Sequence, residues 1–543
     1  MKKYIITCFI LSSSIYLKSQ QNLPGSVVQV VKDFDAKLIE TEKVKVNPDI
    51  PPVDTSKIRY EYQVNPGISD LKYGAPQIRP IQMKPADPIP TYPFYLRAGY
   101  GYPKEAYGRI SYSFANDERT KIGIDFTHLS ANNSNAANTT NRGQRFYDND
   151  LKGHILYLTQ DGMAIQGDAL VSKDRYYHFG HYNQNPTTLT PLAILKHDYD
   201  IIEGSAKIFN PKISSNGVNY FAAAGIYALV DNLTNNETGG NIHLGVTKWI
   251  QDRHSLSLEL GTDFTHFNIV TSSQNLNNFY LLPSIGIHGN AFIAQLGLRV
   301  TSHNDDIVLF PAATISASIA GNALMLIAGA EGGLNKNTYR TLSTYNPFIV
   351  FHPNIENTAS TDYYAGIKGS ASALEYDARI GYKKNNNLPL FTLNTNNFSR
   401  FEIIYRNINI IHGTASVTFR PTKNIVINGA LNKNVFQKNN LEAEAWGLPS
   451  MEINGSIQYS TLNKKLLLTG ETFINDGIPY KDDLGITGKS KLLLDVSLNA
   501  DYHITKNFGV FIQANNLANS KWQRWYRYPT LGLNAVGGIT VKF

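Results

Sequence analysis

A strict two-residue alternation near the carboxyl end of the chain constrains the fold more than any other feature. Between Leu492 and Ile504 every second residue is apolar or aromatic. The six residues between them are Leu493, Asp495, Ser497, Asn499, Asp501 and His503, and all of these except Leu493 are polar. Successive side chains of a β-strand point to opposite faces. The stretch is therefore predicted to be a strand with one apolar face and one largely polar face.

The same alternation recurs throughout the chain after Pro93. Leu256, Leu258 and Leu260, for example, alternate with Ser257 and Glu259. A soluble sandwich that hides its apolar face would show the same pattern, so alternation alone does not choose between a sandwich and a membrane barrel. In a barrel, the polar faces would line the lumen, and the charged candidates for that position are Arg97, Arg109, Glu259, Asp263, Glu375, Asp377, Arg379, Asp495 and Asp501.

The connections between the alternating stretches decide between these two folds. Tight polar turns, such as Gln251-Asp252-Arg253 and Thr505-Lys506-Asn507, alternate with generally longer loops rich in Asn, Thr and Ser. Short turns at one end and long loops at the other are typical of outer-membrane barrels. Ten short turns, with one strand before the first and one after the last, predict an antiparallel all-β barrel of about 22 strands. This count treats 400–419 as one long strand.

Composition supports the barrel and excludes a helical membrane protein. The chain has 32 Tyr and 25 Phe, which suits the aromatic girdles at the two membrane interfaces of a barrel. Its apolar runs all fall short of the roughly 20 residues that a membrane-spanning helix needs.

The amino-terminal residues are predicted to be a signal peptide over 1–20. Lys2 and Lys3 precede a short apolar core, and a Ser/Lys/Gln exit follows near Ser19. Cys8 lies too early in this segment to be a lipoprotein cysteine, and it is the only cysteine of the chain. The mature chain would therefore contain neither a disulfide nor a thiol site.

Residues 21–93 are predicted to be an extended, proline-rich arm in the periplasm. The segment holds 11 of the 24 prolines and has no core of its own. Spaced anchors such as Phe34, Tyr60 and Tyr62 suggest that the arm closes the barrel or docks a partner, because a proline-rich chain loses little entropy on docking. The alternative is a solvated tether. The barrel would then span 94–543.

The last fifty residues resemble those of TonB-dependent receptors. Asn516-Leu517-Ala518-Asn519, then the aromatic pairs Trp525-Tyr526 and Tyr528-Pro529, precede a final strand that ends on Phe543. The family's plug domain has no counterpart, since 21–93 is too short and too rich in proline. The chain therefore resembles the plugless barrels of this type found in Bacteroidetes. A TonB-contacting box is suggested only by Val27, Val28, Val30 and Val31.

The sequence offers no catalytic, cofactor-binding or metal-binding site. His266, His303, Asp305 and Asp306 are not held near one another by any motif. His178 and His181 are spaced for a metal only on a helix or with further ligands, and they fall in a predicted loop. Asp148 and Asp150 lack the rest of a calcium loop. Phosphate-binding loops and nucleophile elbows in a strand-to-helix setting are absent from the sequence.

The net charge and the family resemblance limit the partners and functions that we expect. The net charge of +7 is dispersed, so a nucleic-acid patch is not expected. Expected partners are outer-membrane lipid, including lipopolysaccharide, and other proteins of the cell envelope. The predicted function is that of a non-enzymatic scaffold or channel subunit of an outer-membrane assembly or export complex. The alternative is a TonB-linked transporter for nutrient or siderophore uptake.

Overall fold

A computed structural model describes residues 92–133, 144–178, 196–251, 253–269, 272–303, 306–350, 354–395, 397–437 and 444–543. These residues form an all-β structure with one short helix, α2 (Tyr339–Tyr345). Residues 1–91 lie outside the described part, so the signal peptide and the proline-rich arm stay predictions. Among the described residues, no helix combines the length and the apolar character needed to cross a membrane.

The main sheet contains 22 antiparallel strands. In chain order they are β1 (Phe94–Tyr102), β2 (Glu105–Asn116), β3 (Thr120–Asn132), β4 (Arg145–Leu158), β5 (Ala164–Tyr177), β6 (Lys196–Phe209), β7 (Val218–Asp231), β8 (Asn236–Ile250), β9 (His254–Ile269), β10 (Ser272–His288), β11 (Phe292–His303), β12 (Asp306–Ser318), β13 (Met325–Asn335), β14 (Thr358–Ala371), β15 (Leu374–Asn386), β18 (Ile410–Thr422), β19 (Ile425–Phe436), β20 (Met451–Thr461), β21 (Leu466–Asn475), β24 (Leu493–His503), β25 (Phe508–Asn515) and β28 (Asn534–Lys542).

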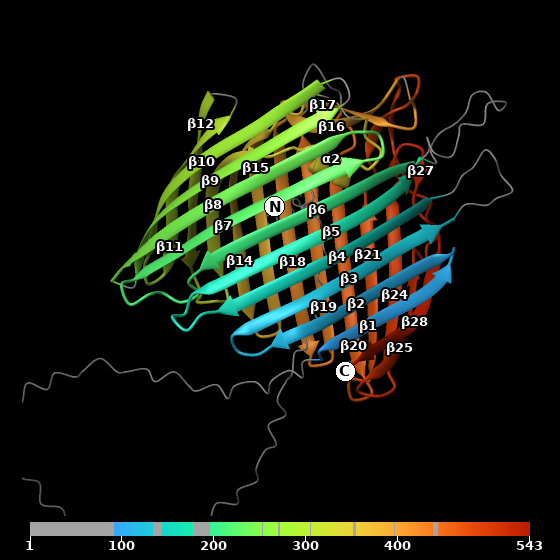
Figure 1. The fold of residues 1–543 in the computed structure, drawn as a ribbon, viewed down its shortest axis with the longest axis horizontal. Coiled ribbons are helices and arrows are strands. Elements are labelled where there is room, and N and C mark those ends of the chain that lie inside the picture. Colours follow the sequence, from blue (N-terminus) through green and yellow to red (C-terminus); the bar gives the residue numbers. More distant parts are fainter. Residues whose placement is uncertain are drawn as a thin grey trace, which may run out of the picture. The chain divides into compact units, whose positions relative to one another are not determined.

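The sheet closes on itself between its first and last strands. β1 pairs with β2 on one edge and with β28 on the other, from Tyr95↔Lys542 to Tyr102↔Ala535. The ring of Phe543 stacks on Phe94, with centroids 4.7 Å apart. Figure 1 shows the tilted strands side by side around the barrel. The predicted closed antiparallel barrel of 22 strands is confirmed.

Six further strands form three small hairpins in the long connections. They are β16 (Leu388–Leu393) with β17 (Phe401–Arg406), β22 (Pro479–Lys481) with β23 (Thr487–Lys489), and β26 (Gln523–Trp525) with β27 (Tyr528–Pro529).

The prediction of a single strand over 400–419 is wrong. This stretch breaks between Arg406 and Ile410, and its first part pairs with β16 outside the barrel. Asn407 marks the break, where its Oδ1 accepts a hydrogen bond from the backbone N–H of Asn387 at 3.0 Å. Both halves alternate in polarity, so sequence periodicity could not show that they pair with different neighbours.

Apolar side chains lie on the exposed face of the barrel strands. In β9, Leu256 is 56% exposed and Leu258 is 40% exposed, whereas Ser255 and Thr265 on the opposite face are buried. In a soluble sheet the exposed face would be polar. The pattern is the reverse here, as expected of a wall whose outer surface meets lipid.

Candidate functional site

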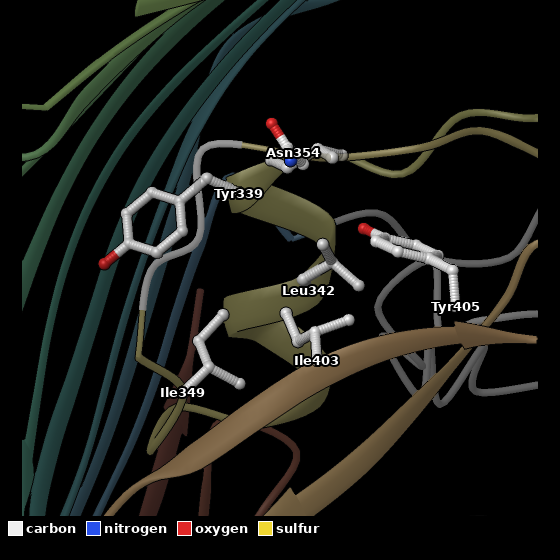
Figure 2. Close-up of a pocket in the computed structure, with 7 residues that line it drawn as sticks. Tyr339, Leu342, Ile349, Asn354, Ile403 and Tyr405 are labelled. Carbon is white, nitrogen blue, oxygen red and sulfur yellow. The ribbon is translucent and has the colours of Figure 1, made fainter. Parts of the chain in front are cut away.

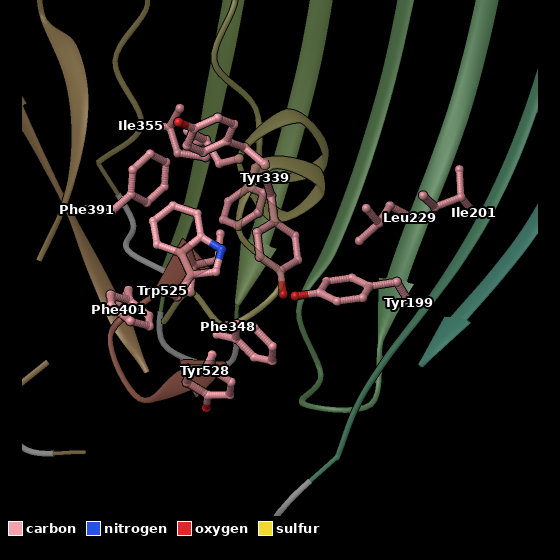
Figure 3. Close-up of a cluster of buried hydrophobic side chains, with 14 of the residues drawn as sticks. Tyr199, Ile201, Leu229, Tyr339, Phe348, Ile355, Phe391, Phe401, Trp525 and Tyr528 are labelled. Carbon is pink, nitrogen blue, oxygen red and sulfur yellow. The ribbon is translucent and has the colours of Figure 1, made fainter. Parts of the chain in front are cut away.

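The long connections of one barrel end pack together into a single structure, which we call the loop cap. It consists of the described residues within 336–357, 387–409, 437–450, 476–492 and 516–533, which connect the strands from β13 to β28. The cap contains α2 and all three small hairpins. Figure 3 shows α2 surrounded by side chains from several of these segments.

The core of the loop cap is aromatic and close-packed. Phe348 stacks on Tyr528 with ring centroids 3.8 Å apart, and Trp525 contacts Phe391 and Tyr345 at 5.3 and 5.6 Å. All five of these side chains are buried. Aromatic pairs at such separations stabilise a core beyond the area that they bury.

The cap also packs against the inner face of the wall far from its own strands. The buried cluster includes Tyr199 from β6, Leu229 from β7 and Phe267 from β9. Tyr528 lies in the connection between β25 and β28, yet its hydroxyl is 3.4 Å from Nδ1 of His178, just beyond β5. Because these strands are widely separated in the order around the barrel, the cap reaches across its mouth.

A buried polar network fixes α2 to the wall. The Tyr339 hydroxyl donates to Asp231 Oδ2 at 2.6 Å, and His197 Nε2 lies 2.9 Å from the same oxygen. The Tyr199 hydroxyl is 2.9 Å from His197 Nδ1 and donates to the Pro347 carbonyl at 3.0 Å. Asp231 and His197 are buried, so their hydrogen bonds are needed to offset desolvation.

A wall carboxylate receives the amino-terminal end of α2. Glu237 of β8 is fully buried and accepts hydrogen bonds from the backbone N–H groups of Tyr339 at 2.6 Å and Arg340 at 3.2 Å. Thr338 caps the helix through a reciprocal pair of hydrogen bonds with Thr341. Arg340 forms a further ion pair with Glu203 of β6. A negative charge at a helix amino-terminus is favourable, so Glu237 and α2 stabilise each other.

Burial shifts the pKa of two cap residues beside this network. It raises the pKa of the Tyr339 phenol well above its usual value, with the nearby hydroxyl of Tyr199 and the carboxylate of Asp231 adding to the shift. Burial also lowers the pKa of Lys336, although Asp263 opposes the change. Tyr339 therefore keeps its proton and acts as the donor to Asp231.

Two pockets in the cap leave little free space. One lies between α2 and β17 and is lined by Tyr339, Leu342, Ile349, Asn354, Ile355, Ile403 and Tyr405. Figure 2 shows the side chains of Leu342, Ile349 and Ile403 close together in it. The other is lined by residues such as Phe391, Tyr480 and Trp525. Each has room for about one water molecule.

Two pairs of the predicted lumen-facing charges are brought together. Arg97 forms an ion pair with Asp501 and lies over the Phe511 ring, 3.7 Å from its centroid. Arg379 and Asp377, two residues apart in β15, pair at 2.8 Å.

The other predicted charges have different neighbours. Arg109 lies 3.7 Å from Asp125, Glu375 lies 2.7 Å from Arg420, and Asp263 lies 3.7 Å from Lys336 of the loop cap. Asp495 accepts hydrogen bonds from Ser497 and from the backbone of Asn516. Glu259 lies opposite Gly245 and Leu282 in the sheet. That these nine residues line a wet lumen stays a prediction.

The structure places the remaining metal-ligand and catalytic candidates as follows. Asp148 and Asp150 lie in β4, not in a loop. His266 Nδ1 lies 2.7 Å from Asn275 Oδ1 across two paired strands. Groups of three or more potential metal ligands are absent from the described part of the chain. His181, Asp305 and the valines of the TonB-box-like segment lie outside the described residues.

Sequence reasoning missed the network around α2. Asp231, Glu237 and His197 lie in or beside turns and strand ends, where polar residues are ordinary. The one available signal was Thr338 with Thr341 three residues later, a spacing that suits a helix cap. This signal was weak because Thr341 stands at the third helical position, where a capping box usually has Glu or Gln.

The same barrel fold occurs in solved outer-membrane receptors. No protein-family model matches the chain, and no curated protein matches its sequence. Solved structures do match: the FrpB iron transporter of Neisseria meningitidis (F3-3 variant) superposes with a TM-score of 0.65 at 10% identity, covering 84% of this chain and 82% of that one.

Two receptors of Pseudomonas aeruginosa match this chain with similar TM-scores. The pyoverdine receptor FpvA, bound to pyoverdine, has a TM-score of 0.62 at 9% identity over 84% of this chain and 79% of its own. A variant of the ferric enterobactin receptor PfeA has a TM-score of 0.61 at 13% identity over 83% and 80%. At such identities the likeness establishes the fold.

Proposed function

We propose that the chain is a non-enzymatic outer-membrane barrel of the plugless type that serves as a scaffold or channel subunit of an assembly or export complex. The loop cap carries this proposal. Its close-packed aromatic core reaches across the mouth of the barrel, where an importer needs an accessible ligand site. A barrel whose own loops pack across its mouth is better suited to a structural role than to ligand uptake.

The apolar exposed face of the wall supports the placement in a membrane. Leu498 of β24 is 54% exposed and Ile512 of the neighbouring β25 is 59% exposed. Alternating exposed apolar residues on every side of a closed barrel are stable only in lipid. With an even number of strands, the short turns and both barrel ends face the periplasm.

The proposed organisation assigns 1–20 to a signal peptide, 21–93 to the periplasmic arm and 94–543 to the barrel. The arm would close the lumen from the periplasm or dock a partner there. Charged side chains facing away from the exposed apolar surface remain partly accessible below the cap. Arg109 is 45% exposed and Asp377 is 29% exposed. Their partial exposure supports the proposal that a further segment docks against them.

Purification in mild detergent tests the scaffold. We expect envelope proteins to be recovered in fixed stoichiometry with the tagged barrel. A barrel that purifies alone, from cells that need TonB and this chain to grow on one particular nutrient, would contradict the proposal.

The second candidate function is TonB-linked import. Its support is the likeness to FrpB, an iron transporter, and to FpvA, which is bound to pyoverdine in the solved complex. Energised import in that family works by pulling on a plug, for which 21–93 is too short. The TonB-box-like valines, Val27, Val28, Val30 and Val31, would contact TonB if this reading holds.

Deleting residues 22–90 tests the arm separately from either function. If the arm closes the barrel, the deletion raises single-channel conductance in planar bilayers while the full-length protein stays nearly silent. Equal conductance of both proteins would show that the arm is a tether and that the loop cap alone limits the pore.

A further inference from the structure

The outward face of β4, β5 and β6 changes in character toward the loop end. Leu151, Val171 and Ile202 lie in one register row across these strands, and they are 46%, 38% and 63% exposed. Because side chains alternate along a strand, every second residue from these three lies on the same outward face. Toward the loop end this face becomes polar, and its basic and aromatic side chains, which we call the basic band, are Arg145, Tyr147, Lys173, Arg175, Tyr177 and Lys196.

The basic band keeps a net positive charge after its ion pairs are counted. Lys173 pairs with Asp200 at 3.2 Å, and Arg175 pairs with Asp198 at 2.6 Å. Lys196 shares Asp198 at 3.0 Å. Two carboxylates therefore face the four basic side chains of the band. Lys173, with 68% of its side chain exposed, remains accessible from outside the barrel.

Arg145 contributes a charge that no carboxylate balances. Its guanidinium carbon lies 4.4 Å from the ring centroid of Tyr177 and 5.8 Å from that of Tyr147. Its Nη2 donates a hydrogen bond to the Tyr147 hydroxyl at 3.3 Å, and Arg145 forms no ion pair with a described residue. The two aromatic rings hold the guanidinium without neutralising its charge. Arg145 is therefore positioned to attract an anion.

Another side of the barrel is polar at its loop end without carrying this charge. Toward the loop end of β9 and β10, the side chains on the outward face include His266, Asn268, Asn275 and Asn277. Neither of these two strands contains Lys or Arg at any position. Polar residues without basic charge are therefore enough to meet the membrane surface there, and the basic residues of β4, β5 and β6 need a more specific explanation.

The height of the basic band on the wall indicates what it contacts. The band lies directly beyond the apolar row of Leu151, Val171 and Ile202, and in the proposed orientation the loop end faces away from the periplasm. Headgroups of the outer leaflet meet the wall at this level, where basic clusters attract anionic headgroups and aromatic rings are common. Arg and Lys bind phosphate through charge-assisted hydrogen bonds. We propose that the basic band binds the phosphate groups of an outer-leaflet glycolipid whose acyl chains pack on the apolar row.

The spread of the band favours a glycolipid over a glycerophospholipid. Neighbouring strands are about 4.8 Å apart, and successive residues on one face of a strand are about 6.6 Å apart, so the four basic side chains cover on the order of 10 Å in each direction. A headgroup with one phosphate would meet one or two of them, whereas a sugar headgroup with several phosphates can meet all four. The inference goes beyond the proposed function, because a scaffold and an importer would both keep this contact.

Lipid binding to the purified full-length barrel tests the basic band. The probes are doubly phosphorylated lipid A, the same lipid without its phosphates, and phosphatidylglycerol, each titrated in detergent and measured by native mass spectrometry. We expect the doubly phosphorylated lipid A to bind about tenfold or more tightly than either of the others. Arg145→Gln combined with Lys173→Gln should weaken that binding by about tenfold or more, because two charges next to the headgroup are lost.

Lys248→Gln is the matched control, because Lys248 lies on the outward face of β8 at the opposite, turn end of the strand. It should change the affinity by less than about twofold. Lys173→Gln alone, at an exposed side chain, should lose roughly fivefold and carries the test if the double variant does not assemble. Equal binding of the three probes, an unchanged affinity in the band variants, or an equal loss in Lys248→Gln would overturn the proposal. Recovery of envelope proteins tests the scaffold separately, so either proposal can fail without the other.

Discussion

The loop cap and the barrel wall use the same kinds of side chain in opposite ways. Trp525 and Phe391 of the cap are buried by their own chain, with 5% and 2% of their surfaces exposed. Leu498 and Ile512 of the wall are more than half exposed. The cap is stabilised as the core of a soluble protein is, by excluding water. The wall needs an apolar solvent outside it.

This difference separates two sources of stability in one molecule. Substitutions in the cap should destabilise the loops while leaving the paired strands intact. Substitutions on the exposed face of the wall should act on insertion and assembly. Four predictions test the separation, from the largest expected effect to the smallest.

Trp525→Ala should have the largest effect. Removing a buried aromatic side chain from a packed core costs about 3–5 kcal/mol. We expect the cap segments to become sensitive to added protease, while the barrel still migrates as a compact, heat-modifiable band. Leu484→Ala, at an 81% exposed loop position, is the control and should change neither property. Loss of the barrel itself in Trp525→Ala would contradict the independence of cap and wall.

Arginine substitutions at two neighbouring positions of β24 test the wall. Val496→Arg places a charge on the face shared with Leu494 and Leu498, which should cost about 2–4 kcal/mol at the bilayer midplane. Ser497→Arg places it on the opposite, polar face, where it stays hydrated. Heat-modifiability measures the assembled fraction of each. Equal losses from both variants would refute the assignment of faces.

Glu237→Gln should loosen α2 by about 1–3 kcal/mol, because a neutral amide replaces a buried carboxylate that accepts from Tyr339, Arg340 and Tyr227. Hydrogen exchange of the α2 amides measures the change. Glu471→Gln, at an exposed wall position, serves as the control. Unchanged protection of α2 would mean that aromatic packing alone holds the helix.

Acid should weaken one peripheral contact of the cap. Partial burial alone would raise the pKa of Asp483, but hydrogen bonds from its own backbone and the nearby Arg527 lower it overall. The ion pair between Asp483 and Arg527, at 2.5 Å, should therefore stabilise the β22–β23 hairpin above about pH 4, the usual pKa of an Asp. This contribution should be lost as the pH falls through the lower pKa that Asp483 has in the folded protein.

The expected contribution of this ion pair is about 1 kcal/mol or less. Limited proteolysis of the hairpin between pH 3 and pH 6 measures it. Asp483→Asn should abolish the pH dependence. A dependence that survives in this variant would have to come from another group.

Much of the barrel followed from local pattern. The alternation over 492–504 predicted β24, and the short turns predicted the strand count, because side-chain period and turn chemistry are properties of neighbouring residues. The aromatic carboxyl-terminal residue, Phe543, also lies where a closing strand requires it, hydrogen-bonded through its backbone to Phe94.

The loop cap could not be predicted in the same way. Tyr528 contacts Phe348, and Tyr339 contacts Asp231, across separations of more than one hundred residues. The aromatic residues of the last loop were visible in the sequence, but periodicity does not show which wall they meet. The break between β17 and β18 was missed because two strands with the same alternation look like one.

The sequence by itself determined the class of fold, the alternation of faces and the number of barrel strands, because each depends on spacing along the chain. Tertiary structure alone decided that the long loops pack into one cap against the wall and that Glu237 receives the end of α2. These features depend on which distant segments meet when the barrel closes, and closure is a property of all 22 strands together.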